Sequence, residues 1–305
     1  MKSINLGGSG LMGSAIGLGC MRISSMGREE LSRHIHTALD CGITFFDHAD
    51  IYGGGESERL FGSVLASEPG LRDQLVLQSK CGIRPNMLDL SKEHILESVD
   101  GILQRLGTDR LDMLLLHRPD VLIEPDQVAE AFERLEQSGK VLHFGVSNFT
   151  SRQIELLQSG LKQKLLVNQM QFGIMCPGLV AHGLEANTQM PHAADRDGEV
   201  LDYCRLKGIT IQAWSPFQYG FFGGTFLDND QFPELNQTLQ EVGDTYGVSK
   251  GAVAAAWILR HPADIQVILG TTKPERVREI AAGSEITLSR EEWYRIYLAA
   301  GNKIP

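Results

Sequence analysis

Short apolar runs alternate with segments of helical periodicity along almost the whole chain, and this alternation restricts the fold more than any other feature. Continuous apolar runs are typical of parallel strands that are buried on both faces. The chain has 305 residues. Interleaved strands and helices over that length predict an α/β fold, a (β/α)8 TIM barrel, as one domain over residues 1–305. The predicted strands are Ala15–Cys20, Ile43–Asp47, Leu75–Ser79, Leu111–His117, His143–Ser147, Leu166–Gln171, Ile209–Trp214 and Ile265–Leu269.

Several residue types mark the expected helix ends. Ser91 could cap a helix, and Thr150 and Ser289 each begin a capping-box pattern, in which a hydroxyl and a side chain three residues later bond reciprocally. Glycines follow helical patterns and precede strands, where a left-handed C-terminal cap is useful. These glycines are Gly42, Gly107, Gly139 and Gly208.

Three glycines near the N-terminus match a dinucleotide-binding fingerprint, in Gly8-Ser-Gly10-Leu-Met-Gly13. That fingerprint needs a preceding strand and a following helix. Here a barely strand-like segment, Ile4–Leu6, precedes it and the strand-like Ala15–Cys20 follows. The pattern therefore predicts an N-terminal β-hairpin.

Two segments lack periodicity, Phe172–Asp197 and Pro216–Phe232. Both follow predicted strands, so we expect long loops on the face of the barrel where the strands end. The second is rich in aromatic residues, which favours a lining for an apolar pocket. His182, His192, Asp195 and Asp197 lie in or at the end of the first loop, but no convincing metal site follows from them.

The overall charge narrows the function classes. A formal net charge of −10 argues against broad binding to nucleic acid or to an anionic membrane. No apolar stretch is long enough to span a bilayer, and the N-terminus lacks the apolar centre of a signal peptide. The five scattered cysteines fit reduced thiols. We therefore expect a cytoplasmic protein.

Four polar residues at or just beyond the ends of predicted strands suggest the chemistry: Asp47, Tyr52, Lys80 and His117. In a barrel such residues meet at the carboxyl ends of the strands. Tyrosine is a weak proton donor at neutral pH, and a nearby lysine ammonium would stabilise the phenolate and lower its pKa. A carboxylate would hold that ammonium, and the histidine could orient a carbonyl oxygen. Each residue alone could equally serve packing or a structural ion pair.

The chain resembles the aldo-keto reductases. The resemblance rests on Asp47-His-Ala-Asp-Ile-Tyr52-Gly, on Glu56-Ser-Glu58-Arg-Leu-Phe-Gly62, on Lys80, on Leu114-Leu-Leu-His117 and on Gly145-Val-Ser-Asn148-Phe. It implies a (β/α)8 barrel and hydride transfer between a nicotinamide cofactor and a carbonyl. It also implies that Tyr52 is the general acid, that Lys80 and Asp47 adjust the pKa of Tyr52, and that His117 orients the substrate.

The resemblance also implies an NADPH/NADP+ site. Ser147, Asn148 and Gln169 would bind the nicotinamide carboxamide, and Trp214 would stack on the ring. After the last predicted strand, Lys273 and Arg276 open a helix, which suits the 2′-phosphate of NADPH. The other implied cofactor positions are Gly19, Met21, Arg22, Asp47, Ser215, Pro216, Gly270, Thr271, Thr272 and Glu279.

We therefore expect an NADPH-dependent reductase of small-molecule aldehydes and ketones, as a monomer or weak homo-oligomer. Two alternatives stay open: a nicotinamide-binding redox sensor or regulatory subunit with slow turnover, and an aldolase-type enzyme with Lys80 as Schiff-base nucleophile. Two positions depart from the family pattern. Ile280 stands where the family commonly has asparagine, and His48 stands where it often has a small residue; His48 could narrow the site or contact the following helix.

Overall fold

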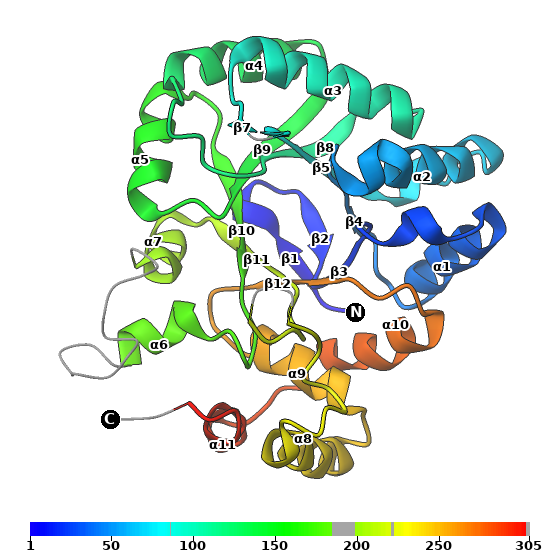
Figure 1. Ribbon diagram of the computed structural model, residues 1–305, viewed down its shortest axis with the longest axis vertical. Helices are drawn as coiled ribbons and strands as arrows, with labels where there is room; N and C mark the ends of the chain where they lie inside the picture. The colour runs from blue at the N-terminus through cyan, green and yellow to red at the C-terminus, as the bar shows by residue number, and fades with distance from the viewer. Residues whose placement is uncertain (86, 185–198, 221–222, 303–305) are drawn as a thin grey trace.

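A closed barrel of eight parallel strands forms the centre of the molecule (Figure 1). The structure, a computed structural model, describes residues 1–85, 87–184, 199–220 and 223–302. Each barrel strand pairs with the next along the chain, and the last pairs with the first. This confirms the predicted fold, with strand ends within two residues of those expected. The strands are β3 (Ile16–Gly19), β4 (Phe45–Asp47), β5 (Val76–Cys81), β8 (Leu111–Leu116), β9 (Val141–Ser147), β10 (Leu165–Gln171), β11 (Thr210–Trp214) and β12 (Gln266–Leu269).

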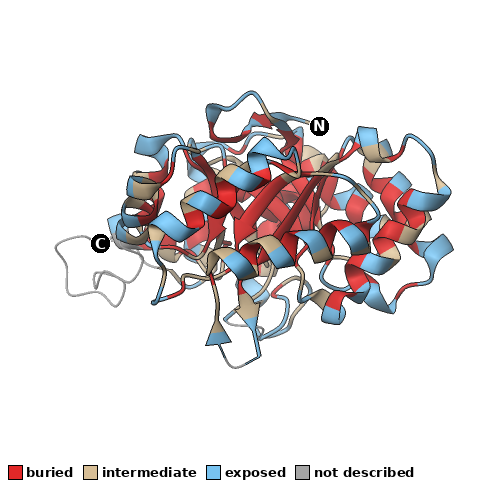
Figure 2. Ribbon diagram, turned by 90° about the horizontal axis from the view of Figure 1, so that it is seen from above, coloured by how far each residue is buried: buried red, intermediate tan, exposed pale blue. Residues whose placement is uncertain are grey.

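Helices surround the barrel, with their buried residues facing the strands and their exposed residues facing outward (Figure 2). They are α1 (Arg28–Asp40), α2 (Glu56–Ser67), α3 (Lys92–Leu106), α4 (Pro125–Gln137), α5 (Ser151–Gly160), α6 (Gly178–Leu184), α7 (Val200–Lys207), α8 (Pro233–Tyr246), α9 (Lys250–Leu259), α10 (Pro274–Ala281) and α11 (Arg290–Ala299). Short 3-10 turns occupy Leu6–Gly8, Ile23–Ser25, Tyr52–Gly55, Arg72–Gln74 and Ala282–Ser284.

The predicted helix ends are confirmed. Ser91 accepts a hydrogen bond from the backbone N–H of His94 at the start of α3. Thr150 and Ser289 form complete capping boxes at the starts of α5 and α11. The glycines expected at helix ends all have positive φ, at 76°, 62°, 70° and 59° for Gly42, Gly107, Gly139 and Gly208.

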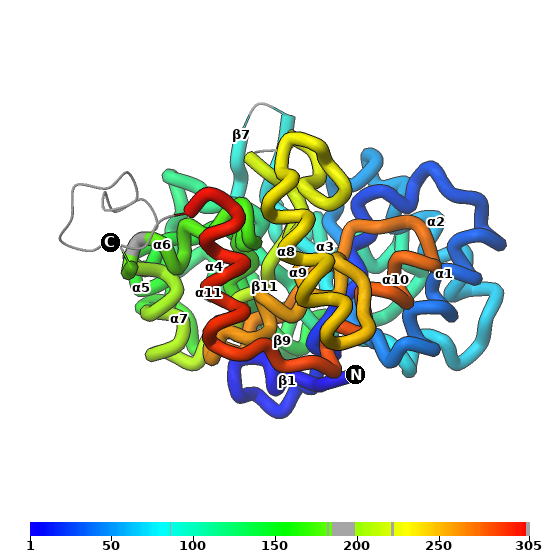
Figure 3. The backbone as a smooth tube through the Cα atoms, turned by 90° about the horizontal axis from the view of Figure 1, so that it is seen from below, coloured from blue at the N-terminus to red at the C-terminus, as the bar shows by residue number. Residues whose placement is uncertain are grey.

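An antiparallel hairpin lies at the opposite end of the barrel from the two-stranded β6 (Ile83–Arg84) and β7 (Met87–Leu88), as Figure 3 shows. It consists of β1 (Ser3–Asn5) and β2 (Met12–Ser14). The N-terminal hairpin is confirmed, but its return strand was placed wrongly. The return strand is Met12–Ser14, and the segment Ala15–Cys20 forms only the first barrel strand, as which it was also predicted. The chain changes direction after Ser14, whose hydroxyl donates to the carbonyl of Ile16.

The turn of this hairpin is attached to the amino ends of β10 and β11. The N–H of Gly7 donates to Thr210 at 3.0 Å, and Lys164 donates to the carbonyl of Gly7 at 2.6 Å. A Cβ on Gly7 would lie 2.7 Å from Cα of Leu166, so the close approach requires glycine. The hairpin therefore closes the amino end of the barrel.

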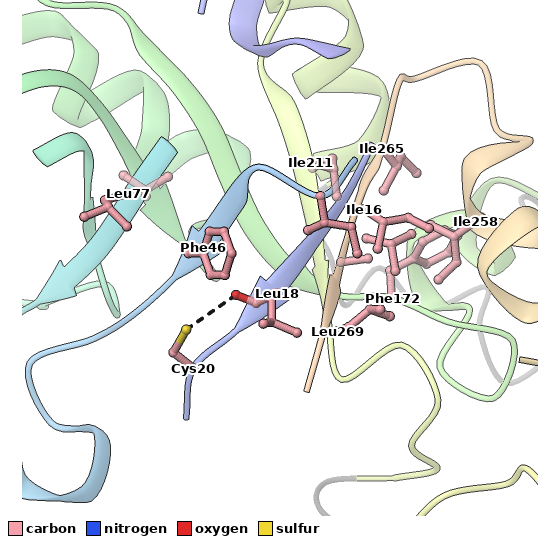
Figure 4. Packing of buried hydrophobic residues seen from close by; sticks show 14 of the residues in the cluster. Ile16, Leu18, Cys20, Phe46, Leu77, Phe172, Ile211, Ile258, Ile265 and Leu269 are labelled. Atoms are coloured by element: carbon pink, nitrogen blue, oxygen red, sulfur yellow. Dashed lines mark hydrogen bonds between the residues drawn. The ribbon is translucent and has the colours of Figure 1, made fainter. Parts of the chain in front are cut away.

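The core has two layers because the barrel strands are covered on both sides. Inside, hairpin residues such as Leu6 pack with Phe45, Met113 and Leu166. Outside, strand residues pack against the helices in a larger cluster, part of which Figure 4 shows around Ile16, Leu18 and Phe46. This two-sided burial accounts for the continuous apolar runs in the sequence.

The described parts of the two aperiodic segments differ from the prediction. Gly178–Leu184 forms α6, so the prediction of a long loop is wrong for that stretch, which begins where Pro177 accepts the first helical hydrogen bonds. Residues 185–198, with His192, Asp195 and Asp197, lie outside the described residues. In the aromatic segment, Phe226 is fully buried against Phe217 and the core, so it does not line a pocket. None of the described helices is both long and apolar enough to cross a bilayer.

Candidate active site

The predicted site residues lie where the barrel strands end. Asp47 is the last residue of β4, Lys80 is the penultimate residue of β5, and His117 directly follows β8. Tyr52 begins the 3-10 turn that connects β4 to α2. Because the strands are parallel, these positions share one rim of the barrel.

Lys80 connects the predicted quartet. Its ammonium lies 2.8 Å from the carboxylate of Asp47, 3.0 Å from the hydroxyl of Tyr52 and 2.7 Å from the carbonyl of His48. The side chains of Lys80 and Asp47 are buried. The ring of His117 lies edge-on to that of Tyr52, with 6.1 Å between the centroids. The structure thus brings together all four residues singled out from the sequence.

Burial sets the protonation of the tyrosine and the lysine in opposite ways. Burial raises the pKa of Tyr52 and outweighs the ammonium of Lys80, which acts to lower it. Lys80 thus acts on the tyrosine in the predicted direction, but the expected net lowering of the pKa is wrong because burial has the larger effect. Burial alone would lower the pKa of Lys80, but the charge of Asp47 and the hydrogen bonds to Asp47 and Tyr52 raise it overall. At neutral pH the site holds a neutral phenol beside an ammonium.

His117 is neutral at the same pH. Burial, followed by the charges of Lys80 and Arg118, holds its pKa well below 6.5. Its Nδ1 is buried without a hydrogen-bond partner, and its Nε2 bonds to no described residue. A neutral imidazole with an unbonded ring nitrogen can donate a hydrogen bond to a carbonyl oxygen without competing for the tyrosine proton.

A chain of glutamine side chains holds Asp47 from inside the barrel. Gln78 donates to Asp47 at 2.6 Å and to Gln212 at 2.8 Å. Gln212 donates to Gln266 at 2.8 Å, and Gln266 donates to the carbonyl of Ser14 in the hairpin at 2.8 Å. The sequence analysis missed this chain, although its signal was a single amide within each of several apolar runs.

Gln169 belongs to the same chain. Its Nε2 donates to Asp47 at 3.2 Å and to Gln212 at 3.1 Å. Only its Oε1 is left to accept a hydrogen bond from a ligand amide.

A second buried charge cluster lies behind the quartet. Glu58 of α2 is fully buried and accepts hydrogen bonds from Ser79 and Arg105, both at 2.7 Å. Burial and the nearby charge of Glu58 raise the pKa of Asp50 to about 7. The N–H of Asp50 donates to the carbonyl of Lys80, so this cluster adjoins β5.

Asp50→Asn is expected to make the protein more stable than the wild type, increasingly so as pH rises. The pKa of Asp50 is about 7 when folded against an ordinary 3.8, so the folded state holds the proton more tightly. That contribution to stability is complete at low pH and is lost as pH rises towards 7. Between pH 5 and pH 8 the variant should gain about 2–3 kcal/mol in unfolding free energy relative to the wild type.

Urea unfolding at both pH values measures this difference, with the exposed Asp100→Asn as the control. A difference that is the same at pH 5 and pH 8 would contradict the assignment of this charge to Asp50.

His48 has one of the two roles that the sequence left open. Its fully buried ring lies edge-on to Phe61 of α2, with 4.6 Å between the centroids. Burial and the charge of Lys80 lower its pKa to about 3. It therefore contacts the following helix as a neutral side chain.

The predicted nicotinamide positions form one connected group. Asn148 donates to the hydroxyl of Ser147 at 2.8 Å and accepts from the indole of Trp214 at 3.3 Å. Trp214 is half-buried, which leaves part of its ring accessible. Asn148 and Ser215 have positive φ angles of 60° and 46°, a costly backbone state for residues other than glycine. Pro216 follows them and is buried.

The predicted phosphate positions lie on the same rim, after β12. Lys273 precedes Pro274, the first residue of α10, and the side chains of Lys273 and Arg276 are exposed. Neither forms an ion pair with a described residue. His34 of α1 bonds to the carbonyl of Thr271 at 3.0 Å and fixes this loop. An exposed pair of unpaired cations at a helix start fits a phosphate group.

The remaining predicted positions surround these groups. Gly270 and Glu279 are exposed, and Thr272 is partly exposed. Gly19 ends β3, where a Cβ would lie 2.8 Å from the carbonyl of Leu269. Met21 and Arg22 follow as exposed residues. Ile280, by contrast, is buried in the core, so it faces away from the exposed cations.

Comparisons with known proteins show which sequences and structures the chain is similar to. The sequence model of the Aldo/keto reductase family matches residues 15–299. The chain is 41% identical over 289 residues to the uncharacterized oxidoreductase YcsN of Bacillus subtilis (strain 168), covering 90% of each chain. It is 36% identical to the 6-dehydroglucose reductase of Agrobacterium fabrum (strain C58), covering 88% of each. A crystal structure of an aldo-keto reductase from Klebsiella pneumoniae in complex with NADPH matches with a TM-score of 0.79 and 25% identity, over 99% of this chain and 96% of that chain.

Proposed function

The chain belongs to the aldo/keto reductase family, and from this premise we propose that it reduces aldehydes and ketones to alcohols with NADPH, using Tyr52 as the general acid. The observation that carries the proposal is the position of the Lys80 ammonium, in contact with both Tyr52 and Asp47. A phenol in contact with an ammonium can release its proton to a carbonyl oxygen, because the phenolate that forms is immediately compensated.

Each side chain has one task in this proposal. Tyr52 donates its proton to the oxygen of the substrate carbonyl, and Lys80 stabilises the phenolate that remains. Asp47 keeps the buried ammonium charged. His117, neutral and adjacent to Tyr52, donates a hydrogen bond from Nε2 that orients the carbonyl oxygen.

The residues present fit a nicotinamide cofactor. Gln169 Oε1 and the Ser147–Asn148 pair offer acceptors and donors for a carboxamide, and Trp214 offers a partly exposed aromatic face. Lys273 and Arg276 offer unpaired cations for a 2′-phosphate. When bound, NADPH supplies the hydride for the carbonyl carbon.

The test uses NADPH oxidation by the purified protein with a panel of activated aldehydes and dicarbonyls. Lys273→Ala/Arg276→Ala is expected to raise the KM for NADPH by about 10- to 100-fold, because two charge-assisted contacts to the 2′-phosphate are lost. The KM for NADH, which lacks that phosphate, should change by less than about threefold. Arg28→Ala, an exposed arginine at the start of α1, is the control.

Two results would count against the proposal. An equal rise in KM for both cofactors would remove the 2′-phosphate assignment, and tight NADPH binding without any turnover would favour the sensor alternative. The Schiff-base alternative is disfavoured, because a nucleophilic amine must lose its proton and the pKa of Lys80 is raised.

A further inference from the structure

Arg118 is a cation of the candidate active site to which none of the proposed roles applies. It directly follows His117, and its Nη1 lies 2.9 Å from the carbonyl of His117 and 3.4 Å from the hydroxyl of Ser147. Its guanidinium carbon lies 6.0 Å from the centre of the Trp214 ring. Its charge acts on both Tyr52 and His117. The guanidinium therefore lies among the groups that would hold the carbonyl and the nicotinamide.

This guanidinium has no carboxylate to balance it. Among the described residues it forms no ion pair, and its Nε and Nη2 make no hydrogen bond. Arginine stays charged at neutral pH even when burial lowers its pKa, as it does here. The side chain is only partly buried.

The charges of the site sum to one positive charge. The ammonium of Lys80 is neutralised by the carboxylate of Asp47 at 2.8 Å. Tyr52 and His117 are neutral, as their pKa shifts indicate. Arg118 is left over, in a chain whose formal net charge is −10. Partial burial makes this guanidinium less well hydrated than one on the surface, and a ligand carboxylate that paired with it would offset that loss.

We propose that Arg118 binds the carboxylate of the substrate and selects carbonyl compounds that carry a carboxylate close to the reacting carbonyl. The inference rests on the proposed reductase function. Two nitrogens of the fork remain free, and a planar fork matches the two oxygens of a carboxylate. A single positive charge balances a single carboxylate, whereas a phosphate dianion would need a second cation. The position of Arg118 next to His117 places this carboxylate near the carbonyl rather than at the far end of a long substrate.

The experiment compares acids with their methyl esters in the wild type, Arg118→Gln and Arg118→Lys. Phenylglyoxylate and its ester carry the test group next to the carbonyl, and 4-carboxybenzaldehyde and its ester carry it across the ring. The quantity measured is the kcat/KM for the acid divided by the kcat/KM for its ester. An acid and its ester differ in the intrinsic reactivity of the carbonyl, but this difference is the same for every variant and cancels when the ratios of two variants are compared. Arg152→Gln, which removes an exposed arginine of α5 with the same net charge change, is the matched control.

The ratio for phenylglyoxylate is expected to fall by about 10- to 100-fold in Arg118→Gln, the usual effect of losing hydrogen bonds to a charged group. Arg118→Lys should retain part of the preference, since it keeps the charge without the fork. The ratio for 4-carboxybenzaldehyde should change less, and Arg152→Gln should change neither ratio.

A binding measurement separates this inference from the proposed function. Benzoate should bind the wild type more tightly than benzamide, by tryptophan fluorescence, and Arg118→Gln should remove that difference whether or not any carbonyl is reduced. Unchanged acid/ester ratios and unchanged benzoate binding in Arg118→Gln would overturn the inference. An equal loss of kcat/KM for acids and esters, accompanied by weaker NADPH binding, would also overturn the inference, because it would assign Arg118 to the cofactor site.

Discussion

Tyr52→Phe is expected to lower kcat/KM for a neutral aldehyde by about 10²- to 10⁴-fold, the usual contribution of a positioned general acid. The change removes one oxygen atom and leaves the ring against His117 and the Lys80–Asp47 pair in place. The carbonyl oxygen then loses its proton donor, because Lys80 is held by Asp47 and His48 behind the tyrosine.

Two further measurements test whether the loss of activity in Tyr52→Phe comes from the missing hydroxyl and not from a damaged cofactor site. NADPH binding by fluorescence should change by less than about threefold, which shows that the pocket is intact. Tyr203→Phe in α7 removes the same oxygen away from the barrel rim and should leave kcat/KM unchanged. If Tyr52→Phe retains full activity, another group supplies the proton and the proposed mechanism is wrong.

Lys80→Met is expected to abolish measurable turnover and to destabilise the fold by about 3–5 kcal/mol, the usual cost of leaving a buried charge without its partner. Asp47 is buried, and the ammonium of Lys80 lies 2.8 Å from its carboxylate. Without that ammonium, only amide donors remain to stabilise the carboxylate, and the phenolate form of Tyr52 loses its counter-charge.

Urea unfolding and kcat separate the two effects. The double variant Lys80→Met/Asp47→Asn removes both charges and should recover much of the stability while turnover stays absent. The exposed pair Lys140–Asp100 is the control, and Lys140→Met should cost less than about 1 kcal/mol. A stable and active Lys80→Met protein would show that the buried ion pair has neither role.

The sequence predicted those parts of the molecule that depend on local pattern. Two-sided burial makes each barrel strand a continuous apolar run, so the strands were placed within two residues. The sequence was enough to predict that Asp47, Lys80 and His117 lie close together, because residues at the ends of parallel strands share one rim of the barrel. Tyr52 follows within a short turn of the same rim.

The parts that were missed depend on partners far apart in the chain. Gln78 and Gln212 are separated by 134 positions, and nothing in their spacing indicates that their amides meet inside the barrel. The direction of the Tyr52 pKa was also missed, since burial is a property of the whole fold and here exceeds the effect of one neighbouring charge. Arg118 was not singled out from the sequence, because its lack of an ion-pair partner among the described residues is visible only when its surroundings are known.

The glutamine chain that runs from Asp47 to the N-terminal hairpin has a consequence for proton supply. Amide side chains neither gain nor lose protons near neutral pH, and here each is fixed in orientation by the next, ending at the carbonyl of Ser14. A row of hydroxyls or waters could transfer protons through the barrel, whereas a row of amides cannot conduct them. If Tyr52 is the proton donor, as proposed, its proton is not replaced along this row of amides and must reach the tyrosine from another side of the site.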